Sequence, residues 1–224
     1  MRTKTKALVL SLCAVLLVVT TVFVTMAFLT SQDSVQNTFT VGEVTISLDE
    51  LDVDNDSNTE DNKTYTVGEE NIVRDKANKY HLLPSETYEK DPTVHVATNS
   101  EDCFVYVKVT NGIAGAEAQT GIYNGDEYKS ISDQIENLGW AKLVVNDKEV
   151  DGVYYKTVAK EDANRDLVVF NEFKIKDEIT NAELATYVTE EENATKIIEV
   201  IAYAVQCAGF DDAADAWSNT FNNL

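Results

Sequence analysis

The stretch AFLTSQDSVQNTFTVGEVTISL, residues 27–48, joins an apolar amino-terminal segment to the first run of alternating apolar and polar residues. Phe39 and Val41 alternate with polar neighbours, and beyond the next glycine the alternation resumes with the opposite parity at Val44 and Ile46. Such alternation is typical of a β-strand with one buried face, and a change of parity at one glycine is typical of a β-bulge. The stretch therefore predicts a bulged strand at the start of the folded domain.

Residues 1–27 have the parts of a secretory signal peptide. Three basic residues form its start, an apolar run follows, and small residues precede a predicted cut between Ala27 and Phe28. We therefore expect a helical signal peptide of residues 1–27 and one exported domain of residues 28–224. The protein would be secreted to the extracellular matrix or the cell surface, and an uncleaved segment of this length would anchor it in the membrane.

The chain is strongly acidic, with a formal net charge of −21. Removal of residues 1–27, which hold three basic residues and no acidic one, would change this charge to −24. Such a surface repels nucleic acid and anionic lipid, so we expect no nucleic-acid partner. Acid, salt or divalent cations would lower the repulsion and permit self-association, whereas the simplest alternative is solubility of a secreted protein.

Short strands separated by turn signals dominate the sequence downstream. Cys103, Val105 and Val107 alternate with Phe104 and Tyr106, so that both faces of this strand are apolar, as in the middle of a sandwich. The most apolar later segment, residues 197–207, is predicted to be the central strand beside it, and further strands are expected at 141–145, 150–158 and 167–175. The fold predicted is all-β, a jelly-roll-like β-sandwich with a few short helices.

Three short helices are predicted from capping residues. Ser132 is expected to begin a helix that ends at Gly139, and Thr180 has capping-box spacing to Glu183. Asp211 is expected to begin the last helix, whose apolar side chains, Ala214, Trp217 and Phe221, would pack on a sheet.

Cys103 and Cys207 are the two cysteines of the predicted mature chain. Antiparallel pairing of the strands beside them would bring the two residues together, and an exported protein permits a disulfide. The alternative is a pair of buried free thiols in a reducing habitat.

Residue type and spacing offer two candidate metal sites. Asp52, Asp54 and Asp56 alternate as in a calcium loop, but Ser57 and Lys63 stand where such a loop requires glycine and glutamate. A solvated acidic loop is the alternative, so we expect no cofactor unless this loop binds calcium.

Zinc would need His81 and His95, the only histidines, with Glu89 or Asp91 as a third ligand. The alternative places one histidine in a loop and the other on the outer face of a strand. No hydrolase, phosphate-binding or dinucleotide-binding motif is present in the sequence, so no catalytic residue is predicted.

Several short segments at both ends and in the middle of the chain are similar to the sequence of one known family. They are Ala27–Thr30, Asp33, Asn37–Gly42, Leu48–Glu50, Tyr80–Pro84, Val94–Val96, Ala202–Gln206 and Gly209–Phe210. Together they resemble the TasA and camelysin family of Gram-positive bacteria, in its clostridial form, with a SipW-dependent signal peptide. The chain departs from that form at Ser85, where glycine is common.

The resemblance implies a jelly roll and a fibre subunit of a biofilm matrix or cell surface. Its partners would be further copies of itself, a dedicated signal peptidase and other matrix proteins. The amino-terminal strand of one subunit would complete the sheet of the next, with Phe39, Val41, Val44 and Ile46 in its groove. Camelysin relatives classed as metallopeptidases imply an alternative, a zinc-dependent surface peptidase; a third is an anchored surface binding domain.

Overall fold

The computed structural model describes residues 5–6, 11–17, 43–54, 63–67, 70–76, 78–187 and 198–221. For residues 63–67 and 70–72 it describes the backbone alone. The chain divides into two units, residues 1–41 and 42–224. In the first unit, residues 5–6 and 11–17 are helical. The predicted cut between Ala27 and Phe28 lies outside the described residues, as do Phe39 and Val41. Among the residues described, no helix is long and apolar enough to cross a membrane.

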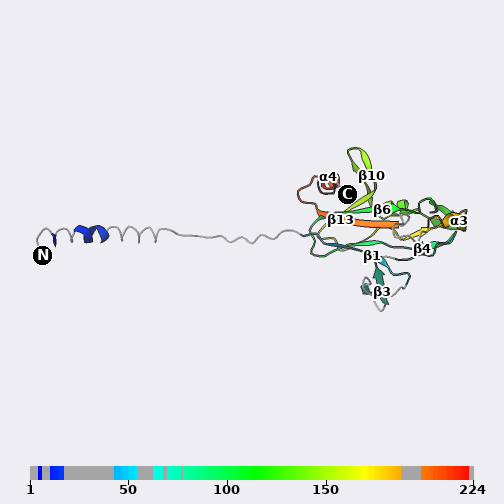
Figure 1. The fold of residues 1–224 in the computed structure, drawn as a ribbon, viewed down its shortest axis with the longest axis horizontal. Coiled ribbons are helices and arrows are strands. Elements are labelled where there is room, and N and C mark those ends of the chain that lie inside the picture. Colours follow the sequence, from blue (N-terminus) through cyan, green and yellow to red (C-terminus); the bar gives the residue numbers. More distant parts are fainter. Residues whose placement is uncertain are drawn as a thin grey trace. The chain divides into compact units, whose positions relative to one another are not determined.

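The second unit is all-β, built from antiparallel sheets with a few short helices (Figure 1). One sheet has the strand order β11-β5-β1-β3-β2. Its strands, in chain order, are β1 (Ile46–Leu51), β2 (Lys63–Val67), β3 (Glu70–Asp75), β5 (Thr93–Val96) and β11 (Asp166–Val168). The facing sheet has the order β13-β6-β10-β9. Its strands are β6 (Cys103–Asn111), β9 (Ala141–Val145), β10 (Lys148–Val158) and β13 (Ile198–Gln206).

Smaller elements complete the second unit. Two strand pairs, β4 with β12 and β7 with β8, form separate two-stranded sheets. Their bounds are β4 (Thr87–Glu89), β7 (Gly121–Tyr123), β8 (Asp126–Tyr128) and β12 (Glu172–Lys174). The helices are α2 (Ile131–Asn137), α3 (Asn181–Leu184) and α4 (Ala213–Thr220).

The main hydrophobic core lies between the two large sheets. Val94 of β5 and Val105 and Val107 of β6 are fully buried in one cluster, which the apolar side chains of β1 and β13 also contact. The other face of β6 carries Tyr106, whose ring lies 5.1 Å from that of Trp217 on α4. Both faces of β6 are therefore covered, which confirms the prediction from its alternating apolar residues.

Two strand predictions were wrong. The segment 197–207 was expected to be central, but among the residues described β13 lies at the edge of its sheet, with β6 as its neighbour. The single strand expected at 167–175 is divided into β11 and β12, which belong to different sheets. The break has a local cause, because Gln134 Oε1 accepts hydrogen bonds from the backbone N–H groups of Asn171 (3.0 Å) and Glu172 (3.2 Å).

Two of the three predicted helix caps were displaced. Ser130 is the N-cap of α2, since its side chain accepts a hydrogen bond from the N–H of Asp133; Ser132 had been predicted as this cap. Asp212 begins α4, where Asp211 was expected, since its side chain accepts from the N–H of Asp215. The capping box of Thr180 and Glu183 was predicted correctly.

Candidate functional site

Among the described strands, β13 has a pairing partner on one side only. In the part of the chain that the structure describes, β6 is the only strand that pairs with it. The N–H of Cys207 bonds to the carbonyl of Asp102, which lies opposite it in the same register that pairs Gln206 with Cys103. Because hydrogen-bonded and non-hydrogen-bonded pairs alternate, the backbone groups of the even-numbered residues from Ile198 to Gln206 point away from β6.

β1 has a shorter unpaired edge, on the side away from β5. The carbonyl of Thr45 accepts from the N–H of Ala97, so by the same alternation the backbone groups of Ile46 and Leu48 point away from β5. β3 pairs with β1 only at Glu50 and Leu51. Ile46 and Leu48 therefore have no strand opposite them among the residues described.

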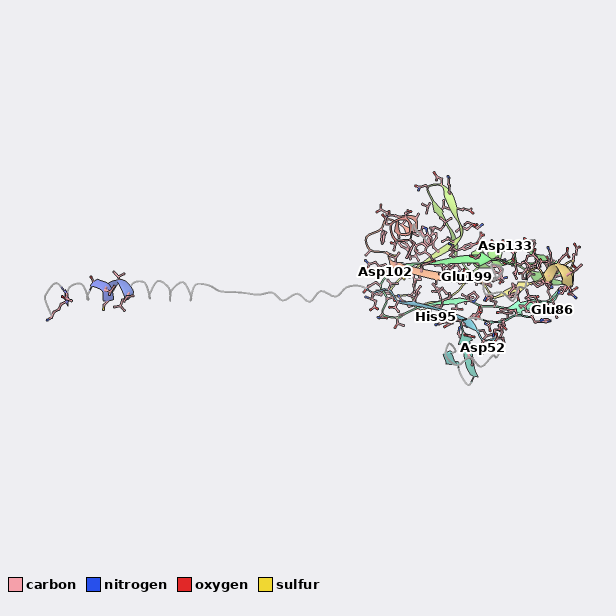
Figure 2. All side chains as sticks on the ribbon, in the orientation of Figure 1. Asp52, Glu86, His95, Asp102, Asp133 and Glu199 are labelled. Atoms are coloured by element: carbon pink, nitrogen blue, oxygen red, sulfur yellow. The ribbon has the colours of Figure 1, made fainter. Side chains whose placement is uncertain are left out.

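A cavity of about 500 Å³ lies beside these two edges, and we call it the β1–β13 cavity. Leu48 of β1 and Ile198 and Val200 of β13 supply apolar walls. Figure 2 shows Glu199 on β13 and His95 in the facing layer, beside β1. The remaining lining residues are Asp49, Glu50, Lys76, Asn78, Lys90, Pro92 and Glu199. The cavity thus combines apolar walls, charged groups and backbone edges, which are the features that accept an added strand.

A charged network anchors the far end of β1. Asp49 is buried, and one of its oxygens, Oδ1, contacts Arg74 Nε at 2.5 Å and His95 Nε2 at 2.8 Å. Arg74 also donates through Nη1 to Asp91 Oδ2 (2.8 Å) and through Nη2 to Thr93 Oγ1 (3.0 Å). β1 is thereby tied by side chains to both of its neighbouring strands.

The network shifts the pKa values of its members. Hydrogen bonding to Asp49 raises the pKa of His95 above its usual value, against the effect of burial, and Asp166, 2.7 Å from His95 Nδ1, raises it further. Burial alone would raise the pKa of Asp49, but the hydrogen bonds from His95 and Arg74 outweigh it, so the pKa is lowered. The folded protein therefore favours the charged forms of both groups.

The structure confirms that Cys103 and Cys207 are neighbours at the ends of β6 and β13. Both are free thiols, Cys103 buried and Cys207 half-buried. Burial raises the pKa of Cys103 to about 11, and burial with the nearby charge of Asp102 raises that of Cys207. Thiolate is the species that reacts, so these shifts slow oxidation, and the disulfide stays a prediction.

The candidate metal ligands are only partly described. Asp54 Oδ2 accepts from the N–H of Lys79, Asp52 is half-buried, and Asp56 lies outside the described residues. His81 is exposed, whereas His95 contacts Asp49 and Asp166. Among the residues described, no group of three or more histidine, cysteine or acidic side chains has a metal-binding arrangement.

Sequence reasoning missed Arg74, Asn78 and Lys90, which the fold brings to β1 from later in the chain. The only signal in the sequence was an acidic pair, Asp49-Glu50, directly after an alternating strand. Comparison with protein-family models, with curated proteins and with solved structures finds no match to this chain.

Proposed function

We propose that this protein is a secreted structural subunit, which forms fibres in a biofilm matrix or on a cell surface by donating an amino-terminal strand to the next molecule. The observation that carries the proposal is a pair of strand edges beside one cavity, on β13 and at the start of β1, that no strand of the described residues covers. Unpaired backbone N–H and C=O groups are a template for an added strand. A jelly-roll arrangement of the two sheets is part of the same proposal.

Residues 28–41 are the donated segment. In one molecule, Val44 and Ile46 already pack against the core of their own domain. The part before Gly42 contains Phe39 and Val41, which alternate as the buried face of a strand requires. This part holds a single charged residue, Asp33, so it can approach an acidic neighbour with little repulsion.

The arrangement leads to a filament. A segment that leaves one molecule and enters a different surface of the next makes a head-to-tail contact. When such a contact does not close into a ring, it repeats without limit. Each subunit would then pair its donated strand with the strand edge of one neighbour, and its own edge would stay open for the strand of the next subunit.

The experiment compares the chain cleaved after Ala27 with two variants. Deletion of residues 28–37 should abolish fibres in electron micrographs while circular dichroism stays unchanged. Phe39→Asp should weaken assembly, because docking would bury an unpaired charge; Asp33→Asn, a change outside the alternating face, is the matched control and should assemble. Fibres from the deletion variant as abundant as from the intact protein would refute strand donation.

The same sample tests the alternative. A surface peptidase requires stoichiometric zinc and cleavage of casein that a chelator stops. A structural subunit should show neither.

A further inference from the structure

Three side chains from different elements meet at the wall of the β1–β13 cavity: Glu50, Asn78 and Lys90. Lys90 Nζ forms a very short contact with Glu50 Oε2, and Asn78 Nδ2 donates to Glu50 Oε1 at 2.9 Å. One carboxylate thus binds an amine and a carboxamide at the same time. The side chains of Glu50 and Lys90 are 6% and 10% exposed, so the contact is largely shielded from water.

The carboxamide of Asn78 is fixed in orientation. Its Nδ2 also donates to the carbonyl of Leu51 (2.7 Å), and its Oδ1 accepts from the backbone N–H of Val53 (2.8 Å). A backbone N–H directed at a carbonyl oxygen stabilises negative charge that develops there during nucleophilic attack. Val53 can therefore play the part of an oxyanion-hole donor.

Lys90 is held in place from the other side. Its Nζ lies 5.7 Å from the centre of the Tyr80 ring, and the ring face attracts its charge. A nucleophile and an electrophile fixed on one carboxylate are already positioned for reaction, which removes much of the entropic barrier.

We propose that Lys90 and Asn78 become joined by an intramolecular amide bond, with Glu50 as the proton-transfer group. Glu50 accepts a proton from Lys90 Nζ, and the free amine attacks Cγ of Asn78. The C–N bond to Nδ2 then breaks, and the leaving nitrogen takes up the two protons that Nζ gives up. The products are a secondary amide and ammonium, so atoms and charge balance without an oxidant or a co-reactant.

The bond would cross-link the segment after β3 to the segment before β5, beside the anchored end of β1. It requires no partner molecule, and it stands independently of fibre formation. Lys174 offers an internal comparison, because it is also buried and contacts the carbonyl of Ser85 and, at 3.8 Å, Asp177. Its hydrogen bond and ion pair among the described residues involve no carboxamide, so Lys174 should stay unmodified.

Mass spectrometry of the full chain, aged in its folded state, tests the proposal. We expect an intact mass lower by one ammonia, about 17 Da. Trypsin should then fail to cut after Lys90 and should leave residues 77–79 attached to that lysine, while cleavage after Lys174 proceeds normally. Recovery of free peptides ending at Lys90, with Asn78 intact, would overturn the proposal.

Two variants assign the chemistry. Lys90→Arg keeps the ion pair with Glu50 but cannot form the amide, and Glu50→Gln keeps the shape but loses proton transfer; both should show the full mass. Loss of ammonia that persists in Lys90→Arg and maps to the peptide of residues 77–79 would mean cyclisation of Asn78 on its own backbone and would refute the cross-link. The peptide map of the unchanged chain decides the matter even where a variant fails to fold.

Discussion

At the scale of single residues, Arg74 supplies a positive charge to the buried carboxylate at the end of β1. It contacts Asp49, whose side chain is only 3% exposed, and Asp91 as well. Arg74→Met should destabilise the protein by about 3 kcal/mol, because the buried carboxylate of Asp49 would lose one of its cationic partners. Urea unfolding measures this loss.

The exposed pair Lys142 and Glu136 provides the control, with side chains 40% and 46% exposed. Lys142→Met should change stability by less than about 1 kcal/mol. Equal effects of the two substitutions would show that Asp49 does not depend on Arg74.

His95 should make stability depend on pH. Its pKa is raised in the folded protein, chiefly by the hydrogen bond with Asp49, so the protonated form favours folding. This stabilisation is fully present below about pH 6.5, the usual pKa of histidine, and is lost as the pH rises through the raised value. Asp49, with its lowered pKa, contributes above its usual value near 3.8 and loses its contribution as the pH falls further.

The measurement is the free energy of unfolding as a function of pH for His95→Gln. This variant should lack the decline in stability that the unchanged protein shows between about pH 6 and pH 8, below the range in which unfolded thiols ionise. His81→Gln, at an exposed histidine, should keep that decline. Parallel curves for the unchanged protein and His95→Gln would contradict the assignment.

At the scale of elements, β13 allows assembly to be separated from folding. The backbone N–H of Ala202 points away from β6, and that of Ile201 points toward it. Ala202→Pro should therefore preserve the pairing with β6 but block an added strand, since proline is tolerated on the solvent side of an edge strand. We expect a folded protein that forms no fibres.

Ile201→Pro is the matched change one residue away. It removes a donor to the carbonyl of Lys108 and should cost about 2 kcal/mol or more in unfolding experiments. If Ala202→Pro forms fibres normally, the edge of β13 is not the acceptor.

The same elements show how far sequence can be read. The alternation of side chains along β6 was enough to predict that both of its faces are buried, because each face carries apolar residues. The pairing of β6 with β13 was also predicted correctly. Alternation could not give the order of strands, because an edge strand packed on one side carries apolar residues much as a central one does. The break between β11 and β12 depends on Gln134, which lies 37 residues before Asn171.

The candidate site was less predictable than the fold. Asp49 lies 25 residues from Arg74, and Glu50 lies 40 residues from Lys90. Such contacts arise only once the register of β1 with β3 and β5 is set. Charged residues near the ends of strands are normally exposed to solvent, so the sequence around them predicts no buried network.

At the scale of the whole molecule, charge should control when subunits assemble. The predicted mature chain carries −24, and repulsion between such molecules acts over about 10 Å at 0.1 M salt but only about 3 Å at 1 M. Light scattering should therefore show faster assembly as sodium chloride is raised, and also as carboxylates are neutralised by acid. Assembly rates that do not change with salt would show that charge is not the barrier.

The pairing of β1 with β5 also decides how a fibre would respond to being pulled. Tension between subunits joined through the segment before Gly42 would enter β1 at its amino-terminal end and run along the strand. In an antiparallel ladder the hydrogen bonds lie across the strand, so this force would strain the pairs from Ile46–Val96 to Asp49–Thr93 together and not one after another. The ion pair of Asp49 with Arg74, at the far end of β1, would share this load. Such a subunit would resist stretching along the fibre far better than peeling at right angles to it.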